Sequence, residues 1–160
     1  MSTKPVKRKM TEQEKWLKSL ARLKTPKSWE KASRNEKDVW TAELIEQYQE
    51  RWNWNFLSRH QSLPWTIELL EQYQDRWNWH NLSQNSALPW TVELMEKYKD
   101  RWDWNGISYI TPLPMTKALL EQFINYWDWV ELSKKYKTTI NYWGNSHEIE
   151  WTIELIDTFK

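Results

Sequence analysis

Hydrophobic and polar positions recur along this chain with a period of 25 residues. Three of the recurring positions are occupied almost entirely by tryptophan, and a fourth is occupied by serine. The four series are Trp40, Trp65, Trp90 and Met115; Trp52, Trp77, Trp102 and Trp127; Trp54, Trp79, Trp104 and Trp129; and Ser58, Ser83, Ser108 and Ser133. Because four independent series share one step, the sequence indicates an internal repeat.

Each repeat predicts a longer helix that begins at a threonine. In "PWTIELLEQYQDRW", Thr66 is suited to the N-cap, and Trp65 and Leu70 occupy the two positions of a hydrophobic staple. Leu69 and Tyr73 then follow at a four-residue step, which places them on one apolar face. The pattern predicts a helix of about twelve residues.

A shorter helix of about two turns is predicted in the second half of each repeat. Its N-caps are Asn53, Asn78, Asp103 and Asp128. A proline then discourages further helix before the next repeat; these prolines are Pro64, Pro89 and Pro114. One position within the short helix differs in every repeat, and we expect it to face outward. Its occupants are Phe56, Asn81, Gly106 and Glu131.

Two helices per repeat, with apolar faces that no single repeat can cover, predict an all-α fold in which the repeats stack as a small α-solenoid. A compact helical bundle is the alternative. The expected organisation is a basic arm (1–9), an N-terminal capping helix with a degenerate first repeat (10–38), four regular repeats (39–133), an insertion (134–150) and a C-terminal capping helix (151–160).

The segments "RWNWNFLS", "RWNWHNLS", "RWDWNGIS" and "YWDWVELS" share the pattern W-[ND]-W-x-x-L-S. In this respect the chain resembles tryptophan-rich repeat arrays of uncharacterised bacterial and giant-virus proteins. The resemblance covers about residues 29–133 and the last ten residues. It implies a repeat architecture and carries no known activity with it.

The amino-acid composition excludes several kinds of chemical site and indicates a cellular location. The chain has no cysteine and two glycines, which excludes disulfides, thiolate chemistry and cysteine-based zinc sites and argues against phosphate-cradling loops. No run of eighteen apolar residues predicts a membrane span, and no leader pattern is present, so we expect a cytoplasmic protein. The formal net charge of +1 is unevenly spread, because residues 1–38 hold 12 Lys/Arg against 5 Asp/Glu.

The tryptophans are expected to be structural. A unit of 25 residues must bury much apolar surface to offset the conformational entropy lost on folding, and the indoles are its largest source of such surface. Every repeated tryptophan also falls at a staple position, on a core face or at the start of the short helix. We therefore predict that most indoles point inward.

No catalytic, metal-binding or cofactor-binding constellation is legible, and we predict a protein that is not an enzyme. The repeated serines sit at the ends of short helices, where a local bond from hydroxyl to backbone explains them. His60, His80 and His147 occupy unrelated places in the repeat, and none has a second histidine three or four residues away.

Two sets of basic residues are candidate contacts to nucleic acid or to an acidic partner. One is the arm, with Lys7, Arg8 and Lys9, and the other is the series Arg51, Arg76 and Arg101, each directly before a repeated tryptophan. The structural alternative for the arginines is stacking on a neighbouring indole or pairing with a carboxylate of the adjacent repeat.

The insertion offers candidate contacts to a partner protein, namely Tyr142, Trp143 and His147, because insertions in repeat arrays often map to a binding face. Our first functional hypothesis is a non-enzymatic scaffold that binds another protein. The alternatives are a nucleic-acid-binding repeat protein that uses the basic arm and the arginine series, and an inhibitor or immunity-type protein. We expect no cofactor and no membrane partner.

Overall fold

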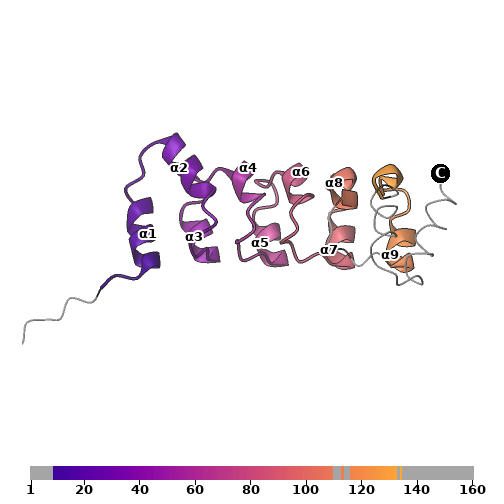
Figure 1. The fold of residues 1–160 in the computed structure, drawn as a ribbon, viewed down its shortest axis with the longest axis horizontal. Coiled ribbons are helices and arrows are strands. Elements are labelled where there is room, and N and C mark those ends of the chain that lie inside the picture. The colour runs from indigo at the N-terminus through magenta and orange to yellow at the C-terminus, as the bar shows by residue number, and fades with distance from the viewer. Residues whose placement is uncertain (1–8, 110–112, 114–115, 133, 135–160) are drawn as a thin grey trace, which may run out of the picture. The chain divides into compact units, whose positions relative to one another are not determined.

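The structure is a computed structural model that describes residues 9–109, 113, 116–132 and 134. In this part of the chain all regular secondary structure is helical, which confirms the all-α class (Figure 1). The labelled helices are α1 (Glu12–Leu20), α2 (Pro26–Ser33), α3 (Ala42–Gln47), α4 (Trp54–Leu57), α5 (Ile67–Gln72), α6 (Trp79–Leu82), α7 (Val92–Lys97), α8 (Trp104–Tyr109) and α9 (Lys117–Gln122), and residues 129–132 are helical as well.

The chain divides into two compact units, one that ends at Pro64 and one that begins at Trp65. In the first unit, α2 and α4 are in contact. In the second unit, α5, α7 and α9 lie in one row, and α6 and α8 lie in another (Figure 1). Repeats in the second unit therefore stack in series, as the 25-residue period predicts.

The predicted helix starts are confirmed. The hydroxyl oxygen of Thr66 accepts a hydrogen bond from the backbone amide of Leu69 at 3.1 Å. The same cap is present at Thr41, Thr91 and Thr116. Asn78 caps α6 by accepting a bond from the amide of Asn81 at 2.9 Å. These side chains satisfy backbone amides that have no partner inside the helix, so each repeat fixes its own helix starts locally.

Both helices of a repeat are shorter than the apolar pattern predicts. α5 has six residues and ends before Tyr73, whose φ of −121° lies outside the helical range, and α6 has four residues. The physical reason lies in the tryptophans. The indole N–H of Trp77 donates to the carbonyl of Leu70 at 3.2 Å, and that of Trp79 donates to the carbonyl of Gln74 at 2.9 Å. Indoles thus satisfy carbonyls that a longer helix would have paired internally.

Aliphatic and aromatic side chains of successive helices form the core. Each long helix contributes two adjacent buried aliphatic residues, and each short helix contributes one. These residues are Leu44, Ile45 and Leu57 in the first unit, and Leu69, Leu70, Leu82, Leu94, Met95, Ile107, Leu119, Leu120 and Leu132 in the second. Among the described helices, none combines the length and the apolar character needed to cross a membrane.

Candidate recognition surface

The tryptophans are packed within the structure, as predicted. Thirteen of them fall among the described residues, and none of these thirteen is exposed. The buried ones are Trp16, Trp29, Trp40, Trp52, Trp77, Trp102 and Trp127. The others are half-buried: Trp54, Trp65, Trp79, Trp90, Trp104 and Trp129. An indole held in this way offers little free face on which a ligand could stack.

Aromatic contacts join one repeat to the next. The ring of Trp102 lies 4.9 Å from Trp79 of the preceding repeat, with the two planes at 67°, and 5.0 Å from Trp90 of its own repeat. Tyr98 lies 4.8 Å from Trp79. Tilted and edge-on pairs of this kind are favourable beyond the area that they bury. The indoles therefore hold neighbouring repeats together.

The repeated serines do more than the sequence indicates. The hydroxyl of Ser83 donates to the carbonyl of Trp79 at 2.7 Å, which confirms the predicted local bond. The same oxygen accepts a bond from the backbone amide of Asp103, twenty residues later, at 2.9 Å. Ser108 repeats this arrangement with the carbonyl of Trp104 and the amide of Asp128. Ser83 and Ser108 thus each link one short helix to the start of the next.

Two arginines of the series, Arg51 and Arg101, contact the preceding repeat. In Arg101, one guanidinium nitrogen bonds the carbonyl of Gln74 at 2.9 Å and another lies 2.8 Å from the carboxylate of Asp75. Its guanidinium lies 5.2 Å from the ring centroid of Trp79. Arg51 is exposed and takes a similar place 5.6 Å from Trp29, and Arg76 is half-buried. For Arg101 this geometry agrees with the structural role given above as the alternative to nucleic-acid binding, in which the arginine stacks on an indole and pairs with a carboxylate of the adjacent repeat.

The glutamate that recurs on the long helix, as at Glu71 and Glu96, also serves contacts between repeats. Lys97 forms an ion pair with Glu71 of the preceding repeat. Gln122 bonds the carboxylate of Glu96 at 3.4 Å in the same way. The recurrence of Glu at these positions is thus explained by repeat stacking, without any external ligand.

The variable position within the short helix does not face outward, and that prediction is wrong. Asn81 is 2% exposed, Gly106 is buried, and Phe56 and Glu131 are half-buried. Gly106 lies between two consecutive short helices. A Cβ atom on Gly106 would lie 3.1 Å from the side chain of Gln84, one repeat earlier.

The same joint occurs in the first unit, where the guanidinium of Arg34 lies 3.7 Å from the ring centroid of Phe56. The spacing of 22 residues is the same as between Gln84 and Gly106. The variable residues therefore form complementary pairs across the joint, a large side chain against a ring in one place and against a glycine in the other.

Two other short-helix positions are both variable and exposed in every described repeat. In the second unit they form a set that we call the short-helix surface: His80, Gln84, Asn105, Tyr109, Val130 and Lys134. Tyr109 is 74% exposed and Val130 is 62% exposed. Asn105 donates to the carboxylate of Asp128 at 2.7 Å, which ties the beginnings of two successive short helices together. This surface combines a fixed backbone with side chains that differ from repeat to repeat.

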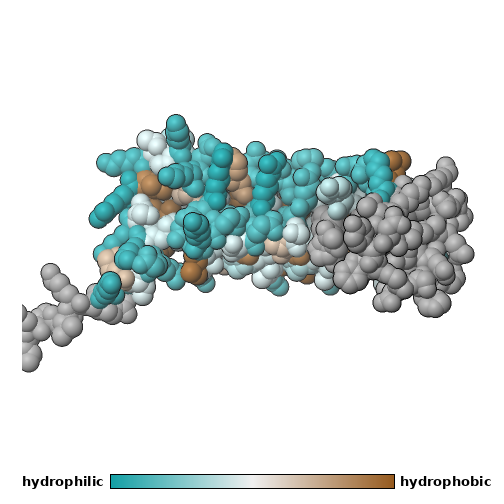
Figure 2. Space-filling model, viewed as in Figure 1, coloured by the Kyte–Doolittle hydropathy of each residue, from teal (hydrophilic) through white to brown (hydrophobic). Residues whose placement is uncertain are grey.

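The face drawn in Figure 2 is mainly hydrophilic over its described residues. Hydrophobic side chains show there as small, separate areas. Scattered apolar residues are ordinary on a protein surface, whereas a wide contiguous patch would mark a large apolar interface. The described residues of this face therefore show no wide contiguous apolar patch.

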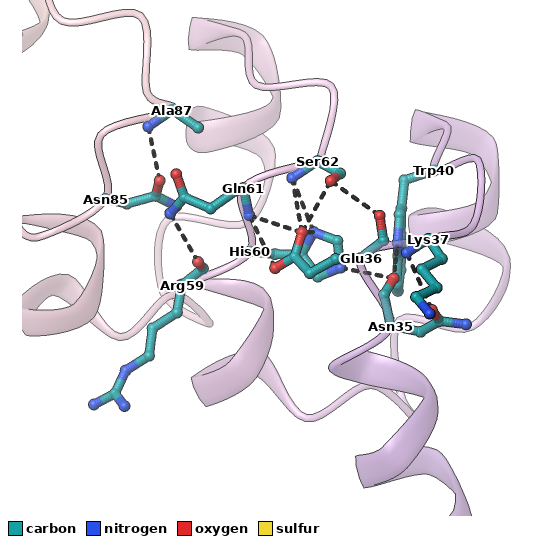
Figure 3. Close-up of polar contacts among 10 residues, drawn as sticks. All are labelled: Asn35, Glu36, Lys37, Trp40, Arg59, His60, Gln61, Ser62, Asn85 and Ala87. Carbon is teal, nitrogen blue, oxygen red and sulfur yellow. Dashed lines mark hydrogen bonds and ion pairs between the residues drawn. The ribbon is translucent and has the colours of Figure 1, made fainter.

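His60 is a buried titratable residue that sequence reasoning did not single out (Figure 3). It is 1% exposed, and its Nε2 lies 3.1 Å from the carbonyl oxygen of Asn35, one repeat earlier. Its Nδ1 lies 3.2 Å from the backbone nitrogen of Ser62 and 3.1 Å from a carboxylate oxygen of Glu36. The ring packs against Trp40 at a centroid distance of 4.8 Å.

Asparagine occupies the same place in neighbouring repeats. The side-chain oxygen of Asn35 accepts a bond from the amide of Lys37, and that of Asn85 accepts one from the amide of Ala87 (Figure 3). His60 Nδ1 receives the amide of Ser62 in the corresponding position. A neutral imidazole that donates from Nε2 and accepts at Nδ1 satisfies both neighbours. His60 is therefore a titratable substitute for an asparagine turn.

Stability should depend on pH through His60. Burial lowers the pKa of this imidazole from 6.5, and the nearby carboxylate of Glu36 opposes that shift. Because the folded state resists protonation of His60, the contribution of the neutral imidazole to the free energy of unfolding is fully present above pH 6.5. As the pH falls below 6.5 toward the folded pKa, the unfolded chain takes up the proton first and the free energy of unfolding declines, by up to about 1.4 kcal/mol per pH unit.

The matched variant is His60→Asn, which installs the residue found at positions 35 and 85. Urea unfolding measured between pH 7 and pH 5 is expected to show a shallower decline for this variant than for the parent chain. Equal slopes in the two proteins would contradict the assignment.

Most of the remaining candidate contact residues predicted from the sequence lie outside the described part of the chain. Lys9 is exposed. Tyr142, Trp143 and His147 of the insertion, and Lys7 and Arg8 of the arm, lie outside the described residues. Within residues 9–134, so far as they are described, no group of three or more His, Cys, Asp or Glu side chains could hold a metal ion.

The chain was compared with protein-family models, with curated proteins and with solved structures, and none of the three comparisons gives a match. Its likeness to tryptophan-rich repeat arrays remains a prediction. The function proposed below therefore depends on the geometry of this chain alone.

Proposed function

We propose that this chain is a non-enzymatic helical repeat scaffold that binds another protein through the short-helix surface. The observation that carries the proposal is the exposure of Tyr109 and Val130 at positions that vary between repeats. The recurring residues Glu71 and Arg101, by comparison, are occupied with contacts between repeats. A cytoplasmic location, expected from the composition, forms part of this proposal.

Tyrosine at such a position suits a binding role. It presents a large, rigid contact area with a polar tip, and aromatic residues are enriched at protein interfaces. Backbone rigidity adds to this, because a surface that is ordered before binding loses less conformational entropy when a partner docks. The indole contacts and the serine bonds between repeats supply that rigidity.

The test replaces an exposed residue by the residue that the next repeat carries at the same position. Tyr109→Lys introduces the residue found at position 134, and Val92→Lys introduces the residue found at position 117. Val92 is 45% exposed and lies on the long helix α7. Both variants gain one positive charge, and neither removes a buried side chain, so the second is a matched control for the first.

Proteins captured from the native host by the parent chain should be lost by Tyr109→Lys, with affinity reduced at least tenfold, and retained by Val92→Lys. Quantitative mass spectrometry of the captured proteins, followed by titration of the purified partner, measures both effects. Retention of every partner by Tyr109→Lys, or equal loss in the two variants, would rule out the short-helix surface as the binding site.

A further inference from the structure

The first unit carries a concentration of positive charge around the loop that joins α1 to α2. Residues 18–31 contain five Lys/Arg and one Asp/Glu. All five cationic side chains are exposed; they are Lys18, Arg22, Lys24, Lys27 and Lys31. We call this set the α1–α2 basic surface.

The acidic residues nearby are occupied with other partners. Glu12 pairs with Lys15 at 2.5 Å, and Glu30 pairs with Arg34 at 2.5 Å. Glu14 accepts the backbone amide of Thr11 in the capping box of α1. None of the ion pairs that the structure shows in its described part includes a member of the α1–α2 basic surface. Its charge therefore remains available to an external partner.

The arrangement is slightly unfavourable for the isolated helices. Lys27 and Lys31 lie four residues apart on α2, so their like charges share one helix face. Lys27 also lies in the first turn of α2, a turn that holds no acidic residue. Three other capped helices, α3, α5 and α7, have Glu in that turn, at Glu43, Glu68 and Glu93. A polyanion that bound here would relieve this repulsion.

The lack of exposed apolar residues on the α1–α2 basic surface favours nucleic acid over an acidic protein as its partner. The exposed large hydrophobic residues of the described chain are Val39, Val92, Tyr109 and Val130, and none belongs to α1, α2 or their loop. Protein interfaces are depleted of lysine and need an apolar centre, which this surface lacks. A regularly charged phosphate backbone needs only cations.

The aromatic residues of this region also point to a double-stranded ligand. Trp16 and Trp29 are buried, and the indole N–H of Trp29 donates to the carbonyl of Leu23 in the loop itself. Binding of single strands normally uses exposed rings on which bases stack. We propose that the α1–α2 basic surface binds the phosphate backbone of duplex nucleic acid without reading its sequence, a function separate from the short-helix surface.

The experiment uses the full chain and a fluorescein-labelled duplex of 20 base pairs, with binding followed by fluorescence anisotropy from 50 to 200 mM salt. The test variant is Arg22→Gln/Lys24→Gln/Lys27→Gln. The matched control is Lys97→Gln/Lys99→Gln/Lys134→Gln, which removes the same net charge from the second unit, where all three lysines are in ion pairs.

We expect the test variant to bind the duplex at least about tenfold more weakly at 100 mM salt, and its slope of log K against log salt to fall by about 2 to 3, since each phosphate contact contributes about 0.9. The control variant should keep the slope of the parent chain. Absence of duplex binding at 50 mM salt, equal loss in the two variants, tighter binding of a single-stranded 20-mer, or binding of polyglutamate in place of the duplex would each overturn the proposal.

Discussion

Replacement of Trp102 by alanine is expected to lower the free energy of unfolding by about 3 to 5 kcal/mol, the range for removal of a large aromatic side chain from a packed core. Trp102 is 6% exposed and contacts Trp79, Trp90 and Tyr98. Its indole N–H also donates to the carbonyl of Met95 at 3.2 Å. One substitution therefore removes buried area, three ring contacts and a helix-end hydrogen bond.

The measurement is urea unfolding followed by far-ultraviolet circular dichroism, because removing an indole alters the fluorescence signal itself. The control is Tyr109→Ala, which removes an aromatic side chain that is 74% exposed and should change stability by no more than about 0.5 kcal/mol. If Trp102→Ala lowered the free energy of unfolding no more than this control does, the indoles would not stabilise the contacts between repeats. A ligand-binding role for the indoles would then be favoured instead.

The substitution Ser83→Ala is expected to destabilise the chain by about 1 to 3 kcal/mol despite removing a single oxygen atom. That oxygen is buried and serves two repeats, since it donates to the carbonyl of Trp79 and accepts from the amide of Asp103. With alanine in its place, the amide of Asp103 loses its partner at the joint between two short helices. A buried donor without an acceptor costs more than a surface hydrogen bond contributes.

Ser19→Ala is the matched control, because the hydroxyl of Ser19 donates to the carbonyl of Trp16 at 2.7 Å from an exposed residue of α1. Its loss should shift the urea midpoint little, within about 0.5 kcal/mol. If the two alanine variants lost equal stability, the bond between Ser83 and Asp103 would contribute nothing, and the serines would be explained by their local bonds alone.

The helix starts could be predicted because they depend on neighbouring residues. A threonine or asparagine side chain caps an amide two or three residues away, as Thr66 and Asn78 do, and no distant part of the chain takes part. The inward packing of the tryptophans was predictable for a different reason. Repeats this short have few other large side chains with which to offset the entropy lost on folding.

The surface, by contrast, was predicted at the wrong positions. Variation between repeats led us to expect Gly106 and Asn81 on the outside, whereas both are buried. A variable residue can face a variable partner, and Gln84 packs against Gly106 as Arg34 packs against Phe56. Sequence variation alone does not distinguish such a pair from an exposed position, because the partner is 22 residues away.

His60 shows the same limit. In the sequence it is one histidine without a second histidine nearby, and no metal or catalytic pattern includes it. Its role became visible only when the fold placed its Nε2 against the carbonyl of Asn35 and its Nδ1 against Glu36. The comparison with Asn35 and Asn85 in the 25-residue frame was a signal that sequence reasoning had available and did not use.

By itself, the sequence determined that this protein is built from 25-residue helical repeats, where their helices begin, and that the tryptophans lie inside, because period, capping and burial depend on local order and composition. Only the tertiary structure decided where those helices end, which side chains form the joints between repeats, and which side chains remain exposed. The helix ends depend on how the indoles pack, as in the bond from Trp77 to the carbonyl of Leu70. The joints depend on contacts between residues 20 or more positions apart, such as Ser83 with Asp103, whose geometry is set by the way in which one repeat stacks on the next.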